Sequence, residues 1–102
     1  MEDKLLKIIN HYGTIPQLRQ LNEECYEFIE SVRNFNQDGN PYNFDHAEEE
    51  FADIMVMLEQ FKLYYGFTDE TIKEIMQQKI DRQIRRIMEE KWQKKNYQDI
   101  SI

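Results

Sequence analysis

Residues 49–58, Glu-Glu-Phe-Ala-Asp-Ile-Met-Val-Met-Leu, decide the fold because they predict a helix that is apolar on nearly every side. One carboxylate, Asp53, is set into this helix. At about 100° per residue, Asp53 shares its face with Val56 and Met57, one turn further along. An unpaired carboxylate in apolar surroundings is costly, so we expect Asp53 to have a basic or cationic partner. Glu50 lies three residues earlier and can share that partner.

Length and composition predict one all-α domain over residues 1–102. The chain has 102 residues, of which 40% are hydrophobic, with three Gly and two Pro. This length suits one compact core, and the scarcity of Gly and Pro favours long helices with few connections. No apolar run approaches the roughly 18 residues that cross a membrane, and residues 1–4 lack the basic start of a signal peptide. We therefore predict a cytoplasmic protein with no membrane partner.

The charged residues argue against a nucleic-acid polymer as partner. The net charge is −7, from 20 acids and 13 bases, and nucleic-acid phosphates would be repelled. Seven bases fall in one late segment: Lys79, Arg82, Arg85, Arg86, Lys91, Lys94 and Lys95. A solvated helix face accounts for most of them. The single cysteine, Cys25, excludes an intramolecular disulfide, and its spacing with apolar neighbours favours core packing over a nucleophilic role.

Helical periodicity divides the first third of the chain into two helices. A short helix is predicted over residues 2–12 and ends at Gly13. A second helix, capped by Thr14, is predicted to run to about Phe35. Its apolar residues recur on one face, which we expect to be buried: Leu18, Leu21, Cys25, Phe28, Ile29 and Val32.

Turn-forming residues separate the second helix from a third. Residues 36–43 are rich in Asn, Asp, Gly and Pro, which predicts a loop. Asp45 with Glu48 three residues later is typical of a capping box that opens a helix. That third helix is predicted to continue to Tyr65, where Gly66 supplies a C-terminal stop.

A fourth helix is predicted from Thr68 to about Lys91. Thr68 can cap it, and acids in its first turn suit the positive end of the helix dipole. Its apolar residues form a seam: Ile72, Ile75, Met76, Ile80, Ile84, Ile87 and Met88. The tail from residue 94 is predicted to fray.

Two short acidic motifs lie on the second and third predicted helices, at residues 23–27 and 49–53. Each contains two acids one turn apart: Glu24 and Glu27, then Glu50 and Asp53. Antiparallel packing of the two helices would bring these four carboxylates together. Their repulsion favours a hard divalent cation with oxygen ligands, Mg²⁺ or Mn²⁺. The alternative is a solvated helix face for the first motif, which leaves Asp53 unexplained.

The order Glu-Glu-x-x-Glu, then Glu-x-x-Asp on the next helix, resembles the signature of the MazG-like, all-α nucleoside triphosphate pyrophosphohydrolases. The motif residues are 23–27 and 50–53, with 22 residues between them, and the resemblance extends over residues 10–90. It implies a four-helix-bundle-like domain with a short N-terminal helix. It also implies Mg²⁺-dependent cleavage of a nucleoside triphosphate between the α and β phosphates, giving a monophosphate and pyrophosphate. Such an activity suits removal of unwanted nucleotides.

The resemblance also implies roles for individual residues. Carried over position by position, the Mg²⁺ ligands would be Glu24, Glu27, Glu50 and Asp53, with Mn²⁺ as a substitute cation. Glu23, the remaining acid of the first motif, would orient or deprotonate the attacking water.

Phosphate contacts are implied on the fourth predicted helix. Some family members have a Lys, an Asn and an Arg spaced along a late helix, and Lys79, Gln83 and Arg86 hold that spacing here. Gln83 departs from the family's Asn at that position. Arg82 falls on the same stripe, beside the apolar seam, where a positive side chain could contact a bound triphosphate.

The sequence indicates the nucleobase site less clearly than the metal ligands. A base requires an aromatic or apolar slot with a few polar groups to read its edge. Gln20, Tyr42 and His46 are the candidates, with Tyr12 and Phe44 as alternatives, and packing or a surface position also explains each. On a helix, His46 would sit beside the proposed metal, because it precedes Glu50 by four residues.

Two other readings compete with the hydrolase. A di-iron carboxylate bundle requires Glu-x-x-His motifs, and neither His11 nor His46 follows a Glu by three residues. A helical interaction module without chemistry explains the helices and the charge but not Asp53. Whatever the function, the two long helices leave one side of the apolar third helix uncovered, which predicts a homodimer. The resemblance also allows a homotetramer.

Overall fold

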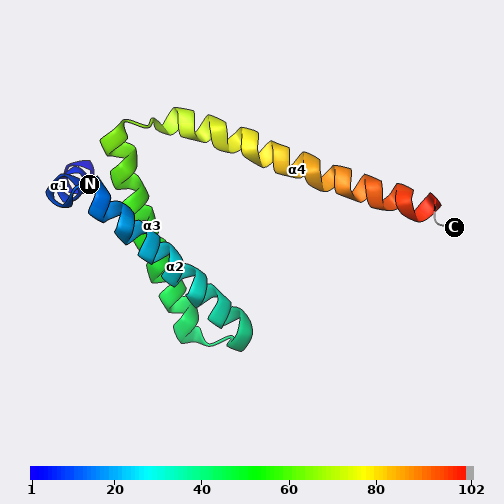
Figure 1. The fold of residues 1–102 in the computed structure, drawn as a ribbon, viewed down its shortest axis with the longest axis horizontal. Helices are drawn as coiled ribbons and strands as arrows, with labels where there is room; N and C mark the ends of the chain where they lie inside the picture. The colour runs from blue at the N-terminus through cyan, green and yellow to red at the C-terminus, as the bar shows by residue number, and fades with distance from the viewer. Residues whose placement is uncertain (101–102) are drawn as a thin grey trace. The chain divides into compact units, whose positions relative to one another are not determined.

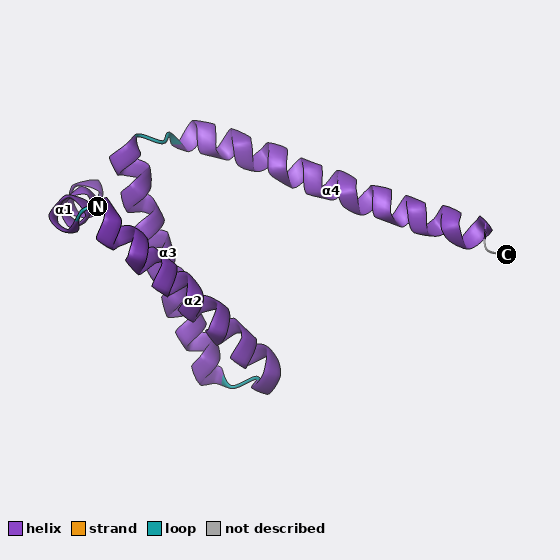
Figure 2. Cartoon of the chain, in the orientation of Figure 1, coloured by secondary structure: helices purple, strands orange, loops and turns teal. Residues whose placement is uncertain are grey.

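The chain is all-α over the residues that the computed structural model describes, 1–100, with side chains described for residues 1–95 (Figures 1 and 2). Its elements are α1 (Glu2–Tyr12), α2 (Thr14–Asp38), α3 (Pro41–Tyr65) and α4 (Asp69–Ile100). The predicted all-α class is confirmed, and each of the four predicted helices is present.

These helices form two compact units, Met1–Phe67 and Thr68–Ile102. In the first unit α2 and α3 make the main contact, and α1 packs on α3 and, to a lesser extent, on α2. The second unit consists of α4. One domain over residues 1–102 stays a prediction. None of the four helices is long and apolar enough to cross a membrane over its described residues.

The connection between α2 and α3 is shorter than the sequence predicts. α2 continues past the expected end at about Phe35 to Asp38, so the loop expected over residues 36–43 shrinks to Gly39 and Asn40. Gly39 adopts the left-handed conformation (φ 63°, ψ 17°), and its N–H donates to the Phe35 carbonyl at 2.7 Å. Glycine takes this conformation without a Cβ penalty, which explains why the helix ends there.

The capping box predicted at Asp45 and Glu48 is wrong, because α3 begins earlier. Asn40 is the N-cap, and its side-chain oxygen accepts a hydrogen bond from the Tyr42 N–H at 3.0 Å. Pro41 occupies the first turn, where its fixed φ and missing N–H cost nothing. An Asn-Pro pair is therefore a stronger helix start than the acids that follow it.

The predictions for the remaining helix ends are partly confirmed. Thr14 was expected to cap α2, but Gly13 is the N-cap and Thr14 is already helical, without a side-chain cap. Gly66 ends α3 in the left-handed conformation, as predicted. The predicted cap of α4 is confirmed, since the Thr68 hydroxyl accepts a hydrogen bond from the Thr71 N–H at 3.2 Å.

α4 is longer than predicted. It passes the expected end at about Lys91 and continues to Ile100. Fraying of the tail from residue 94 stays a prediction, and residues 101–102 lie outside the described residues. In the expected apolar seam, Ile72 is half-buried. The other seam residues are exposed: Ile75, Met76, Ile80, Ile84, Ile87 and Met88.

The contact between α2 and α3 is more polar than the hydrophobic pattern predicts. The buried apolar side chains described in the chain are Leu5, Ile9, Met57 and Phe61. On α2, Gln17 and Ser31 are buried instead, and Gln17 donates to Gln60 of α3 at 2.7 Å. The expected apolar face of α2 lies to one side, so Leu18 and Ile29 are exposed and the rest are half-buried: Leu21, Cys25, Phe28 and Val32.

Candidate metal centre

The two acidic motifs meet because α2 and α3 run antiparallel on either side of a two-residue connection (Figure 1). Glu24 lies on α2, and Glu50 and Asp53 lie one turn apart on α3. One carboxylate oxygen from each of the three lies within 4.8 Å of the other two. This convergence is the one that the sequence predicts for antiparallel helices.

The buried acid of this cluster is Glu50, and not Asp53 as the sequence predicts. Asp53 is exposed, whereas Glu50 is only 6% exposed and Glu24 is half-buried. The expectation of a buried Asp53 is therefore wrong. The reason is that α2 packs along the line of Glu50 and Met57, and Asp53 lies on the flank of that line.

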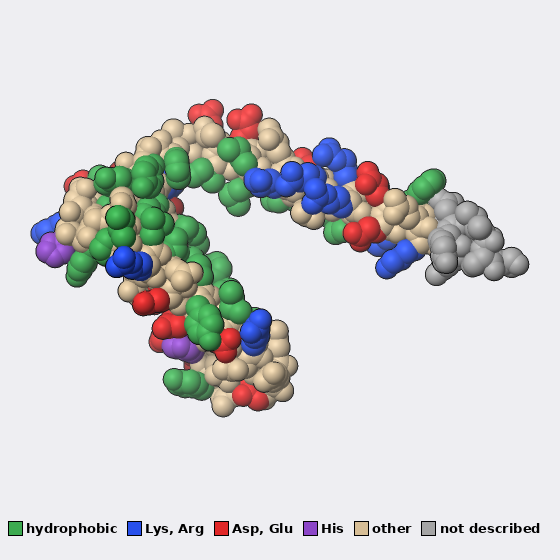
Figure 3. Space-filling model, viewed as in Figure 1, with side chains coloured by type: hydrophobic (Ala, Val, Ile, Leu, Met, Phe, Trp, Pro, Cys, Tyr) green, Lys and Arg blue, Asp and Glu red, His purple; other side chains and the backbone are tan. Residues whose placement is uncertain are grey.

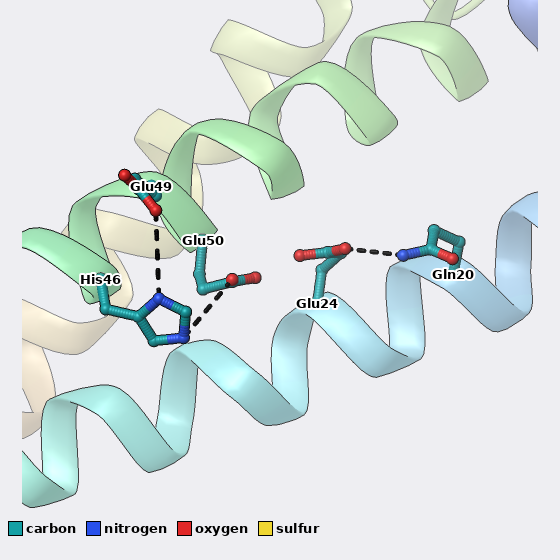
Figure 4. A network of polar contacts seen from close by, with 5 residues as sticks. All are labelled: Gln20, Glu24, His46, Glu49 and Glu50. Atoms are coloured by element: carbon teal, nitrogen blue, oxygen red, sulfur yellow. Dashed lines mark hydrogen bonds and ion pairs between the residues drawn. The ribbon is translucent and has the colours of Figure 1, made fainter. Parts of the chain in front are cut away.

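Two carboxylate oxygens in this cluster have unmet hydrogen-bonding capacity. Oε2 of Glu24 and Oε2 of Glu50 are both buried and have no hydrogen-bond partner. The other oxygen of Glu24, Oε1, accepts a hydrogen bond from Gln20 Nε2 at 2.6 Å (Figure 4). A buried acceptor without a partner is costly, so this site is suited to receive a proton or a cation.

The pKa values of the three acids respond to this crowding. The adjacent Glu24 carboxylate, to which a protonated Glu50 can donate, raises the pKa of Glu50 to about 8, with burial and the charge of Glu24 as further causes. The same interaction with Glu50 lowers the pKa of Glu24. Asp53 is exposed as a residue, but partial desolvation of its carboxylate, followed by the charge of Glu24, raises its pKa. The metal-free cluster therefore retains a proton on Glu50 at neutral pH.

A second group shares Glu50 and contains a histidine. Glu27 of α2 and His46 of α3 join Glu50, with one ligand atom from each within 4.8 Å of the others. His46 Nε2 lies 3.7 Å from Glu50 Oε1, and His46 Nδ1 lies 4.0 Å from Glu49 Oε2 (Figure 4). Thus Glu27, a predicted ligand beside Glu24, groups with His46 instead.

The other predicted site residues occupy different positions. Glu23 is exposed on α2 outside both groups, and Gln20 is held by Glu24. Tyr42 stacks on His46, with ring centroids 6.0 Å apart and planes 5° from parallel. The predicted phosphate contacts all lie exposed on α4, in the second unit: Lys79, Arg82, Gln83 and Arg86. Lys and Arg side chains are prominent along that helix in Figure 3.

An apolar groove between α2 and α3 was not predicted. Its volume is about 310 Å³, and it is lined by Phe28, Val32, Phe35, Phe44, Ala47, Glu48 and Phe51. The signal in the sequence is the pair of aromatic spacings, seven residues from Phe28 to Phe35 and seven from Phe44 to Phe51, which places each pair on one helix face.

No protein-family model, curated protein or solved structure matches this chain. The resemblance to MazG-like enzymes therefore rests on the motif residues themselves.

Proposed function

We propose that the protein is a Mg²⁺-dependent nucleoside triphosphate pyrophosphohydrolase of the MazG-like type, acting in the cytoplasm on the α–β phosphate bond. The observation that carries the proposal is the approach of Glu24 and Glu50 across α2 and α3, each with a buried carboxylate oxygen that lacks a partner. A protein that needed these acids only for solubility would expose them to water.

The residues present fit a hard divalent cation. Glu24, Glu50 and Asp53 offer oxygen atoms alone, which is the donor set that Mg²⁺ and Mn²⁺ prefer. Glu27 approaches Glu50 from the neighbouring turn of α2. When bound, the ion supplies charge neutralisation of the triphosphate and a lowered pKa for coordinated water.

The remaining roles fall to side chains outside the carboxylate cluster. The proposal assigns to exposed Glu23, next to Glu24 in the chain, the orientation of the attacking water and the acceptance of its proton. It assigns triphosphate binding to the α4 side chains Lys79, Arg82, Gln83 and Arg86. Tyr42 and His46 form a stacked aromatic pair beside the cluster, which supports their assignment to the base.

Lys79→Ala is expected to raise KM by about tenfold or more and to change kcat less, since a charge-assisted hydrogen bond to phosphate contributes about 1.5–3 kcal/mol. Steady-state kinetics over a range of triphosphate concentrations measures both constants. Lys95→Ala removes the same charge from the opposite face of the same helix and serves as the control. An unchanged KM in Lys79→Ala would place Lys79 outside the site.

The proposal is tested by product analysis over a panel of ribo- and deoxynucleoside triphosphates, with Mg²⁺ and with excess chelator. Metal-dependent release of pyrophosphate and a monophosphate supports it and names the preferred base. Release of orthophosphate and a diphosphate would keep the cation site but contradict the proposed bond.

The second candidate is a helical interaction module without chemistry, and the exposed apolar side chains favour it. On α3 alone, Phe51, Met55 and Leu58 are each about half exposed. Exposed apolar area of this kind typically marks a protein interface. This candidate predicts no turnover of any nucleotide and no rise in melting temperature with Mg²⁺.

Both candidates include a homo-oligomer, and we expect a homodimer or homotetramer in sedimentation or light-scattering measurements. Phe51→Ala should weaken association by about tenfold or more, because aromatic side chains at the centre of an interface contribute the most. Tyr26→Ala, which removes an exposed aromatic side chain from α2, is the matched control. A wild-type chain that stays monomeric at high concentration would contradict this expectation.

A further inference from the structure

The histidine-containing group beside the all-oxygen cluster has its own ligand chemistry. We propose that Glu27, His46 and Glu50 form a second cation site that selects a borderline transition-metal ion such as Zn²⁺ over Mg²⁺, with Glu50 shared between the two sites. The inference goes beyond the proposed function, because it concerns metal binding and holds whether or not the protein hydrolyses a nucleotide.

The spacing of the ligand atoms suits a cation better than a direct contact. His46 Nε2 and Glu50 Oε1 are 3.7 Å apart, which is too long for an N–H···O hydrogen bond. Zinc bonds to imidazole nitrogen and carboxylate oxygen are about 2.0–2.2 Å, so one ion can hold both atoms at this separation. A ligand atom of Glu27, from the opposite helix, lies within 4.8 Å of both.

The burial of Glu50 is the second observation. Its side chain is only 7% exposed, and its Oε2 is buried without a hydrogen-bond partner. His46 lies at ion-pair distance from one oxygen of this carboxylate, and the other oxygen has no hydrogen-bond partner. A carboxylate has two oxygens and can bridge two cations about 3.5–4 Å apart, as in two-metal sites. Glu50 belongs to both groups, which is the position that a bridging ligand occupies.

The surroundings of His46 are those of a metal-binding imidazole. Histidines that bind metals usually present the other ring nitrogen to a carboxylate, which fixes the ring orientation. Glu49 Oε2 lies 4.0 Å from His46 Nδ1, and Glu50 lies nearer to Nε2 (Figure 4). The ring of Tyr42 stacks on His46 from a third direction and restricts its rotation. Three neighbours on α3 thus surround the imidazole, and Nε2 is the ring nitrogen nearer to Glu50.

The donor types explain the selectivity. One imidazole nitrogen with two carboxylates is a set that Zn²⁺ and similar ions accept, whereas Mg²⁺ takes oxygen ligands. The group of Glu24, Glu50 and Asp53 contains oxygen donors alone. The two sites therefore differ in the cation that they prefer.

The test uses ¹⁵N-labelled full-length protein that carries Cys25→Ser, which removes the single thiol as a competing zinc ligand. The chain has two histidines, so the imidazole nitrogen resonances can be followed for each. We expect Zn²⁺ to shift the His46 ring nitrogen strongly and to leave His11 on α1 unchanged. Mg²⁺ at the same concentration should not produce that coordination shift.

Calorimetry with the same protein gives the affinities. His46→Gln and Glu27→Gln are expected to weaken Zn²⁺ binding by about tenfold or more, and His11→Gln, the control, should leave it unchanged. Glu49→Gln should weaken it by about tenfold, the lower range for outer ligand partners. Zinc that shifts both histidines alike, shifts neither, or binds His46→Gln as tightly as the parent would overturn the inference. Asp53→Asn keeps the two proposals distinct, because it should lose the Mg²⁺ response and retain the His46 shift.

Discussion

Replacing Asp53 by Asn is expected to lower the rate of Mg²⁺-dependent nucleoside triphosphate turnover by about a thousandfold or more. The helical fold is expected to be retained. The variant removes one anionic oxygen from the group of Glu24, Glu50 and Asp53. Charge stabilisation by a bound metal contributes several kcal/mol to the transition state, and about 1.4 kcal/mol corresponds to tenfold in rate.

The same variant is expected to be as stable as the parent, or more stable, in the absence of metal. Partial desolvation of the carboxylate and the charge of Glu24 raise the pKa of Asp53, so its ionised form is disfavoured in the folded protein. Asparagine has nearly the same shape and no charge, so the repulsion is relieved. Thermal unfolding followed by circular dichroism separates this effect from loss of the fold.

Asp45→Asn provides the control for Asp53→Asn. Asp45 lies on the same helix, is exposed, and belongs to neither group of metal-ligating residues. The control should keep full activity. Undiminished turnover in Asp53→Asn would remove Asp53 from the ligand set.

The metal-free protein is expected to lose stability as the pH rises from about 4.5 to about 8. Glu50 has its ordinary pKa of 4.5 when unfolded and a pKa raised to about 8 when folded. Between these values the folded state holds a proton that the unfolded chain has released, so the free energy of unfolding falls with rising pH. Raising a pKa by one corresponds to about 1.4 kcal/mol, so the total loss of stability is on the order of a few kcal/mol.

The neighbouring acids do not reverse this trend. The raised pKa of Asp53 acts in the same direction. The lowered pKa of Glu24 contributes stability that is lost only as the pH falls below its ordinary value of 4.5. Glu50→Gln removes the titrating group, so its stability should change less over the interval. Glu48→Gln, at an exposed position two residues earlier, should behave as the parent does.

Denaturant unfolding of metal-free protein at several pH values measures the trend. Mg²⁺ is expected to restore the stability lost near pH 8, because a bound cation replaces the proton on the cluster. Stability that stays level or rises between about pH 5 and about pH 8 would show that Glu50 does not retain its proton in the folded state.

The helices could be predicted from sequence because their signals are local. Gly13 and Gly66 end α1 and α3 where predicted, and the Thr68 cap is in place. The start of α3 differs from the prediction because turn-forming residues around Asn40 and Pro41 favour a loop, whereas the cap geometry of Asn40 opens the helix. These errors concern a few residues at helix ends, where local signals compete.

Which acid would be buried could not be predicted, because it depends on how α2 rotates against α3. Hydrophobic periodicity indicated that the apolar face of α2 would be turned inward. The inward line instead holds Gln17, Glu24 and Ser31, spaced by seven residues, and it faces Glu50 and Gln60. A polar pair such as Gln17 and Gln60 has no signature in apolar periodicity. The pattern of apolar residues therefore could not show that Glu50, and not Asp53, is the buried acid.

The measurement that tests the central claim most directly is ³¹P NMR of the wild-type reaction with Mg²⁺ in ¹⁸O-enriched water, with its preferred triphosphate. We predict a nucleoside monophosphate and pyrophosphate as products, with ¹⁸O on the monophosphate, because water attacks the α-phosphorus. Addition of excess chelator should stop the reaction. Label in orthophosphate with a nucleoside diphosphate, or turnover that continues without a divalent cation, would contradict the proposed reaction.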